Sequence, residues 1–136
     1  MQEVYLCLDV GGTEIKAAPL DTQGNLLAEI RHFPAMAGGD KETLLENFAH
    51  IFREICPAGA TPVEIDLAFP GPFDYENGVC RLKGLDKYDA LYGCDLRRAF
   101  SAISGLPGQR IRFLNDAAAF ALGEMAFGSA VQAHKA

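Results

Sequence analysis

The stretch Asp9-Val10-Gly11-Gly12-Thr13-Glu14-Ile15-Lys16 joins two apolar segments through a pair of glycines. Glycine has no Cβ, so its backbone can adopt positive φ and approach a ligand closely, and successive N–H groups can line a concavity that favours anions. Thr13 and Lys16 add a hydroxyl and a positive charge, and Asp9 can hold a hydrated Mg²⁺ that screens phosphates. The same pattern is also typical of a two-residue β-hairpin turn. By itself, the stretch fits a turn and a phosphate site equally well.

This turn differs from the common nucleotide-binding loops. The chain contains neither G-x-G-x-x-G nor G-x-x-x-x-G-K-[ST], and both of those motifs require a helix directly afterwards. Residues 14–20 instead have the pattern of a strand, with Pro19 limiting it near its end. If phosphates bind here, they bind a β-hairpin and not the N-terminus of a helix.

The composition excludes several classes of protein. The 136 residues are 49% hydrophobic and 22% charged, as expected for one globular domain with its own core. A net charge of −6 disfavours binding to nucleic acid or to anionic membranes, because both select clustered Lys and Arg. The N-terminus lacks the positive segment of a signal peptide, and no apolar stretch reaches ~20 residues, so we expect a cytoplasmic protein. Four cysteines without a C-x-x-C pair indicate reduced thiols instead of a zinc or redox site.

Turn residues and hydrophobic periodicity predict an α/β fold in which an antiparallel meander is followed by crossover units. The expected elements are strands over 4–10, 14–20 and 26–33, a helix capped by Asp40 and ended by residues 56–59, a strand over 63–69, a hairpin over 73–82, a helix from Asp95 through Ile103 closed by Gly105 and Pro107, a strand over 110–114 and a last helix beginning at Asn115-Asp116. Right-handed crossovers add parallel strands. The order therefore predicts a mixed sheet of three antiparallel strands followed by two parallel strands, with helices on both faces and a small hairpin insertion.

Three loops follow strands that should be neighbours: residues 9–13, 70–72 and 115–116. In open sheets with parallel strands, ligands collect at the carboxyl ends, so these loops outline a candidate site. Each also has a structural explanation, because Pro70-Gly71-Pro72 suits a tight turn and Asn115-Asp116 suits a helix cap. The helix dipole would stabilise the ionised form of Asp116 by about 0.3–1 kcal/mol. Phosphoryl transfer tolerates such a weak base, because it depends mainly on positioning and charge screening.

The three segments form an ordered set of motifs. They read Asp9-x-Gly11-Gly12-Thr13-x-x-Lys16, Ala68-x-Pro70-Gly71-Pro72 and Asn115-Asp116-Ala117-x-Ala119-x-Ala121-Leu122-Gly123-Glu124. Together they resemble the motifs of the ROK sugar kinases, which belong to the hexokinase, actin and Hsp70 superfamily. The resemblance covers essentially the whole chain and implies that residues 1–136 form a ribonuclease H-like lobe of the actin-like ATPase type. The chain departs from the family at Ala118, where a second Asn is frequent.

The resemblance implies a role for each motif residue. Gly11, Gly12 and Thr13 would contact the phosphates of ATP, Lys16 would support them, and Asp9 would act through Mg²⁺, by way of water. Asn115 would hydrogen-bond the sugar, the Gly71 backbone would lie along it, and Asp116 would orient and deprotonate the attacking hydroxyl, usually the sixth of a hexose.

Family members continue into a second lobe, with another phosphate loop, the adenosine pocket, further sugar ligands and often a zinc site. General-base catalysis by Asp116 is worth about 3–5 kcal/mol, whereas holding two substrates between closing lobes is worth about 7–11 kcal/mol. A first lobe alone keeps the smaller contribution. We therefore expect residues 1–136 to be a truncated chain or a fragment with negligible kinase activity, and we expect the choice of sugar to be made mostly by the second lobe.

Three functions fit these features. The first is the N-terminal lobe of an ATP:hexose phosphotransferase acting on glucose or a related hexose or N-acylhexosamine. The second is a sugar-sensing ROK-type transcriptional regulator, which normally carries a helix-turn-helix segment before the lobe, whereas this chain reaches its first strand by Val4. The third is a non-catalytic interaction module, because the Ala- and Phe-rich last helix of an isolated lobe would expose apolar surface and favour a homo-oligomer. Asp116 and the early first strand favour the kinase, with ATP and a sugar as its partners.

Overall fold

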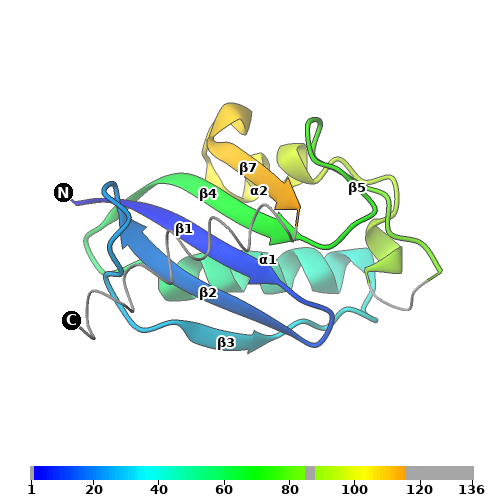
Figure 1. The fold of residues 1–136 in the computed structure, drawn as a ribbon, viewed down its shortest axis with the longest axis horizontal. Helices are drawn as coiled ribbons and strands as arrows, with labels where there is room; N and C mark the ends of the chain where they lie inside the picture. The colour runs from blue at the N-terminus through cyan, green and yellow to red at the C-terminus, as the bar shows by residue number, and fades with distance from the viewer. Residues whose placement is uncertain (1, 85–87, 116–136) are drawn as a thin grey trace.

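The computed structural model describes residues 2–84 and 88–115, which form a five-stranded sheet with two helices packed against it (Figure 1). The elements are β1 (Glu3–Val10), β2 (Glu14–Asp21), β3 (Arg31–Pro34), α1 (Lys41–Ile55), β4 (Thr61–Phe69), β5 (Phe73–Asp74), β6 (Val79–Cys80), the 3-10 turn η1 (Asp89–Leu91), α2 (Leu96–Ser104), the 3-10 turn η2 (Gly108–Arg110) and β7 (Ile111–Asn115). The strand order in the sheet is β3-β2-β1-β4-β7, and β5 and β6 form a separate small ribbon. Within the described part of the chain, neither helix is long and apolar enough to cross a bilayer.

The strand pairing confirms the predicted meander followed by crossovers. β1 and β2 are antiparallel, as are β2 and β3, whereas β4 runs parallel to β1 and β7 runs parallel to β4. Parallel neighbours need a crossover connection, which α1 and α2 supply. The β5–β6 ribbon is the predicted hairpin insertion. Both described helices share one face of the sheet, and the last predicted helix lies outside the described residues. Asn115 ends β7 instead of beginning that helix.

The third strand is shorter than predicted. The pattern predicts a strand over residues 26–33, but β3 begins at Arg31, and the continuous β2–β3 ladder starts at the pair of Ala17 with Arg31. The reason lies in β2, which runs through Pro19 to its end. The Pro19 carbonyl accepts a hydrogen bond from the Leu27 N–H at 3.0 Å, but proline has no N–H to return. The ladder therefore breaks opposite Pro19.

The helix boundaries follow from local capping residues, as predicted. The Asp40 carboxylate accepts a hydrogen bond from the Thr43 N–H at 2.8 Å, and the Asp95 carboxylate accepts one from the Arg98 N–H at 3.1 Å. Each bond satisfies a donor that the first helical turn leaves unpaired. Gly105 closes α2 in the left-handed region at φ +77, which glycine adopts at little cost. These features fix where α1 and α2 begin and where α2 ends.

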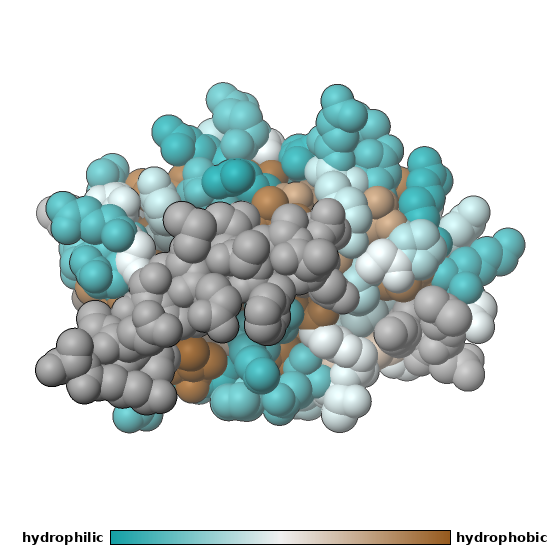
Figure 2. Space-filling model, viewed as in Figure 1, coloured by the Kyte–Doolittle hydropathy of each residue, from teal (hydrophilic) through white to brown (hydrophobic). Residues whose placement is uncertain are grey.

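The core lies between the sheet and the two helices and is rich in aromatic rings. Phe48 of α1 packs on Phe100 of α2 with ring centroids 5.0 Å apart, and Phe69 and Phe113 extend the cluster along β4 and β7. Alternate residues of a strand point to opposite faces, so Glu64, Asp66 and Arg112 point to the other face of the sheet. Around the rim of the molecule the described side chains are mainly hydrophilic (Figure 2). Since Phe69 is the last residue of β4, the core reaches the edge where the predicted loops lie.

Candidate active site at the carboxyl edge of the sheet

The structure places the three predicted segments at one edge of the sheet. The parallel register pairs Asp9 with Ala68 and Phe69 with Asn115, so β1, β4 and β7 end side by side. We call this the carboxyl edge. The turn over residues 9–13, the loop over 70–72 and the end of β7 all lie along it (Figure 1). Asp116, the predicted base, lies outside the described residues.

The β1–β2 turn is held in place by the backbone around it. The Gly11 N–H donates to the Glu14 carbonyl at 3.0 Å, which closes the turn. The Thr13 carbonyl accepts from the Ala35 N–H at 3.0 Å, just beyond β3. The hydroxyl of Tyr88 donates to the Gly11 carbonyl at 2.6 Å. Three hydrogen bonds thus hold the turn in place, while Gly12, Thr13 and Glu14 remain exposed.

The glycines of the turn do not have the backbone conformation expected from the sequence. Neither Gly11 nor Gly12 adopts positive φ. A Cβ at Gly11 would instead lie 2.7 Å from the Glu14 carbonyl oxygen, closer than van der Waals contact allows. Glycine is needed here because two backbone segments meet, which a side chain would prevent.

Asp9 and Lys16 lie directly opposite one another across β1 and β2, and both are exposed. Lys16 in turn lies opposite His32 of β3, and the His32 Nδ1 is 3.2 Å from a carboxylate oxygen of Glu14. Charged groups of both signs therefore line the sheet beside the turn. Mg²⁺ is usually held by one or two carboxylates together with phosphate oxygens and water. An exposed carboxylate at the end of β1 suits an ion held in that way.

The loop over residues 70–72 is anchored on both sides. The hydroxyl of Tyr75 donates to the Phe69 carbonyl at 2.7 Å, and the ring of Phe73 stacks on that of Phe69 with centroids 4.9 Å apart. Gly71 itself is exposed, and a Cβ there would lie 3.5 Å from the Tyr75 hydroxyl. The loop therefore offers a bare stretch of backbone at the carboxyl edge, as a site in contact with a small polar ligand would need.

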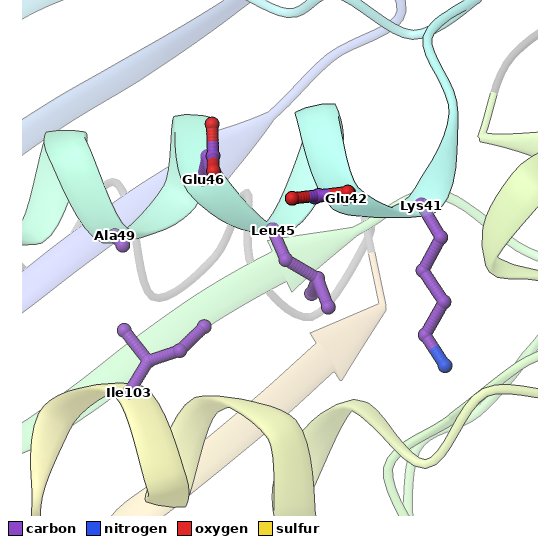
Figure 3. A pocket seen from close by; sticks show the side chains of 6 residues that line it. All are labelled: Lys41, Glu42, Leu45, Glu46, Ala49 and Ile103. Atoms are coloured by element: carbon purple, nitrogen blue, oxygen red, sulfur yellow. The ribbon is translucent and has the colours of Figure 1, made fainter.

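A separate groove of about 460 Å³ lies between α1 and α2 (Figure 3). It is lined by Lys41, Glu42, Leu45, Glu46, Ala49 and Ile103. Leu45 and Ile103 point toward one another across it, and its walls include no residue of the 9–16 turn or the 70–72 loop. The groove is therefore not an extension of the carboxyl-edge site.

Sequence reasoning missed two residues that support this site. Tyr75 and Tyr88 fall in stretches that the pattern assigns to a hairpin and a loop, and neither belongs to a motif. Both donate a hydroxyl hydrogen bond to a backbone carbonyl at the end of a sheet strand or in the turn beside it. The available signal was weak: an aromatic residue in a polar loop is often buried, because its ring needs an apolar partner.

The fold is that of a ribonuclease H-like lobe of the actin-like ATPase type. The sequence model described as the ROK family matches residues 5–136, and the chain belongs to that family. The glucokinase of Thermotoga maritima is 25% identical over 122 residues, which cover 90% of this chain and 36% of that protein. This chain therefore spans about a third of the length of that curated relative.

Solved structures show the same relationship. The ROK hexokinase of Thermus thermophilus superposes with a TM-score of 0.72 at 30% identity, over 89% of this chain and 38% of that one. The inorganic polyphosphate/ATP-glucomannokinase of Arthrobacter sp. strain KM gives a TM-score of 0.72 at 25% identity, over 94% and 50%. The fold alone is shared with a ROK family transcriptional regulator, at 17% identity and a TM-score of 0.68, over 91% and 30%.

Proposed function

We propose that this chain is the N-terminal lobe of an ATP-dependent sugar kinase, which transfers the γ-phosphoryl group to a hexose hydroxyl. The acceptor is the 6-hydroxyl of glucose or of a related hexose or N-acylhexosamine. The observation that carries the proposal is the meeting of the 9–13 turn, the 70–72 loop and the end of β7 at the carboxyl edge. It is supported by relatives named glucokinase, hexokinase and ATP-glucomannokinase.

The phosphate half of the site is the β1–β2 turn. In this proposal phosphate oxygens lie along the backbone of Gly11, Gly12 and Thr13. The N–H donors come from Gly12 and Thr13, because the Gly11 N–H is bonded to the Glu14 carbonyl. Lys16 adds positive charge beside them. Bound Mg²⁺ would screen the phosphate charges, and Asp9 would hold it through water. Phosphoryl transfer passes through a loose transition state, so aligned donors and cations supply most of what a protein can contribute.

The sugar half lies across β4 and β7. Asn115 hydrogen-bonds sugar hydroxyls, the Gly71 backbone lies along the sugar, and Asp116 takes the proton of the attacking hydroxyl. The register supports the first two roles, because Asn115 pairs with Phe69, two residues before Gly71. The assignment of Asp116 rests on its place directly after Asn115 in the family motif.

The remaining parts of the kinase belong, in this proposal, to a second lobe that closes over the carboxyl edge. Closure between two lobes is worth about 7–11 kcal/mol of the barrier. Residues 1–136 alone would keep the phosphate turn and the base but not the closure. We therefore expect this lobe by itself to have negligible activity.

The test uses the full-length protein that contains this chain. ADP release is followed with ATP, Mg²⁺ and a panel of glucose, mannose, N-acetylglucosamine and N-acetylmannosamine. We expect turnover with at least one sugar, and Asp116→Asn should lower kcat by about 10²–10⁴-fold with little change in KM. The matched control is Asp95→Asn, which removes a carboxylate but keeps an N-cap residue on α2. Full activity of Asp116→Asn would contradict the assigned base.

The regulator remains a second candidate, because its fold is the same. A regulator would bind a sugar without transferring phosphate. Calorimetric sugar binding by the full-length protein, with no ADP release for any sugar of the panel, would favour the regulator and contradict the kinase.

A further inference from the structure

Tyr88 connects three segments that meet beside the phosphate turn. Its side chain is fully buried, and its hydroxyl donates to the Gly11 carbonyl at 2.6 Å, across 77 positions of sequence. Its own N–H donates to the Ala37 carbonyl at 2.7 Å, in the segment after β3. Its ring packs edge-on against Phe69, at the end of β4, with centroids 5.7 Å apart. One residue thus joins the turn, the segment after β3 and the strand that leads into the 70–72 loop.

These contacts close a ring of hydrogen bonds. The turn is bonded to the segment after β3 through the Thr13 carbonyl and the Ala35 N–H, that segment is bonded to Tyr88, and Tyr88 is bonded back to the turn. Two residues of this closed set of hydrogen-bonded segments have positive φ: Met36, between Ala35 and Ala37, at 54, and Tyr88 at 60. Non-glycine residues rarely adopt this conformation, and it persists where surrounding contacts enforce it. The closed set of hydrogen bonds therefore holds the turn in one arrangement, and Met36 and Tyr88 bear a conformational cost.

The bond to Gly11 sets the direction of the next N–H group. In a trans peptide unit the C=O and the N–H point in opposite directions. Because the Gly11 carbonyl points to the buried Tyr88 hydroxyl, the N–H of Gly12 points away from it. Gly12 is exposed, and its N–H donates no hydrogen bond to any other residue that the structure describes. An N–H donor is thus held outward on the exposed side of the turn.

We propose that Tyr88 is a positioning residue for this turn, and that its hydroxyl aims the Gly12 N–H at the phosphates of the nucleotide. The inference rests on the proposed function of the turn. Tyr88 does not touch the phosphates itself. Without its hydroxyl, the Gly11 carbonyl loses its buried partner, the peptide unit is free to rotate, and the N–H leaves the direction that phosphate binding requires.

The test is Tyr88→Phe in the full-length protein, which removes the hydroxyl and keeps the ring on Phe69. The matched control is Tyr92→Phe, because Tyr92 is half exposed and its hydroxyl makes no hydrogen bond within the described part of the chain. Calorimetry measures the dissociation constants of ATP, inorganic tripolyphosphate and adenosine, and steady-state kinetics measures KM for ATP and for the sugar. Tripolyphosphate isolates the phosphate contacts, and adenosine isolates the rest of the nucleotide site.

We expect Tyr88→Phe to weaken ATP and tripolyphosphate about five- to tenfold, in keeping with the loss of one buried hydrogen bond. KM for ATP should rise by the same factor, while adenosine binding and KM for the sugar stay near those of the unchanged protein. The melting temperature should fall by about 2–4 °C, because the Gly11 carbonyl is left unpaired. Tyr92→Phe should change none of these values. Unchanged ATP binding in Tyr88→Phe, or equal weakening of ATP and adenosine, would overturn the positioning role. Absence of ATP and tripolyphosphate binding in the unchanged protein would instead overturn the proposed function, and this inference with it.

Discussion

Asp66 places a carboxyl group within the sheet, on the face opposite α1 and α2. Its Oδ1 atom is buried and has no hydrogen-bond partner among the described residues. Burial and the nearby charge of Glu64 raise the pKa of Asp66 from 3.8 to about 7, against the opposing effect of Arg112. Among the described residues, further ionisable neighbours are Cys7, whose thiol is 4.0 Å from Oδ2, and Arg110, which is 3.6 Å from a Glu64 oxygen. Asp66 should therefore hold its proton in the folded protein at pH values where an exposed aspartate is ionised.

The sign of the effect on stability follows from proton binding. Between about pH 4 and pH 7 the folded state keeps the proton on Asp66 and the unfolded state loses it, so the free energy of unfolding falls as the pH rises. Above about pH 8 Asp66 is ionised in both states, and the loss is nearly complete. A pKa change from 3.8 to about 7 corresponds to about 4 kcal/mol, at about 1.4 kcal/mol per pKa unit. Of this, about 2 kcal/mol is lost between pH 5 and pH 7, and about 3 kcal/mol between pH 5 and pH 8.

Asp66→Asn removes this titration and keeps the shape of the side chain. Urea unfolding at pH 5, 6, 7 and 8 should show the unchanged protein losing about 3 kcal/mol more than the variant across this range. The control is Glu76→Gln, which removes an exposed carboxylate and should follow the unchanged protein. Parallel curves for the unchanged protein and Asp66→Asn would refute the raised pKa and the reasoning from burial.

Three further predictions concern the turn, the core and a helix cap. Gly11→Ala should weaken tripolyphosphate binding at least about tenfold, because its Cβ would lie 2.7 Å from a backbone oxygen and force the turn to shift. Gly38→Ala, where a Cβ meets nothing within 4 Å, is its control, and equal binding by both variants would contradict the steric argument. Phe100→Ala should lower the free energy of unfolding by about 3–5 kcal/mol, and Ile103→Ala on the exposed side of the same helix by less than about 1 kcal/mol. Asp40→Ala should cost about 1 kcal/mol in the same urea measurement, whereas Asp40→Asn, which can still cap, should cost less than half of that.

The fold was largely predictable because its main determinants are local. Asp40, Asp95 and Gly105 act on backbone groups within four residues, so their positions in the sequence were enough to place both helices. The apolar run of β1, and the mostly apolar run of β4 interrupted by Glu64 and Asp66, were likewise enough to identify these strands. Where the prediction was wrong, in the third strand, the cause was a hydrogen bond that Pro19 could not donate to a neighbouring strand.

The candidate site was predictable only in part. Its motif residues Asp9, Gly11 and Gly71 were identified from their types and spacing, and the parallel register then placed their segments at one edge. The supporting residues were not found, because Tyr75 and Tyr88 act through hydroxyl groups that reach distant backbone carbonyls. The positive φ expected of the paired glycines is not found, and the sequence cannot show that Gly11 instead faces the Glu14 carbonyl.

The sequence by itself determined the order of strands and helices, the helix ends, the family motifs and therefore the ROK resemblance. The strands, helices and helix ends depend on interactions between residues a few positions apart, whose energies are much the same in any fold. The motifs are recognised from residue types and spacing alone. Only the tertiary structure decided that Tyr88 holds the Gly11 carbonyl and that Asp66 is buried beside Glu64. Both depend on which distant segments pack together, since the direction of a peptide unit and the pKa of a carboxyl group are set by the atoms that surround them in space.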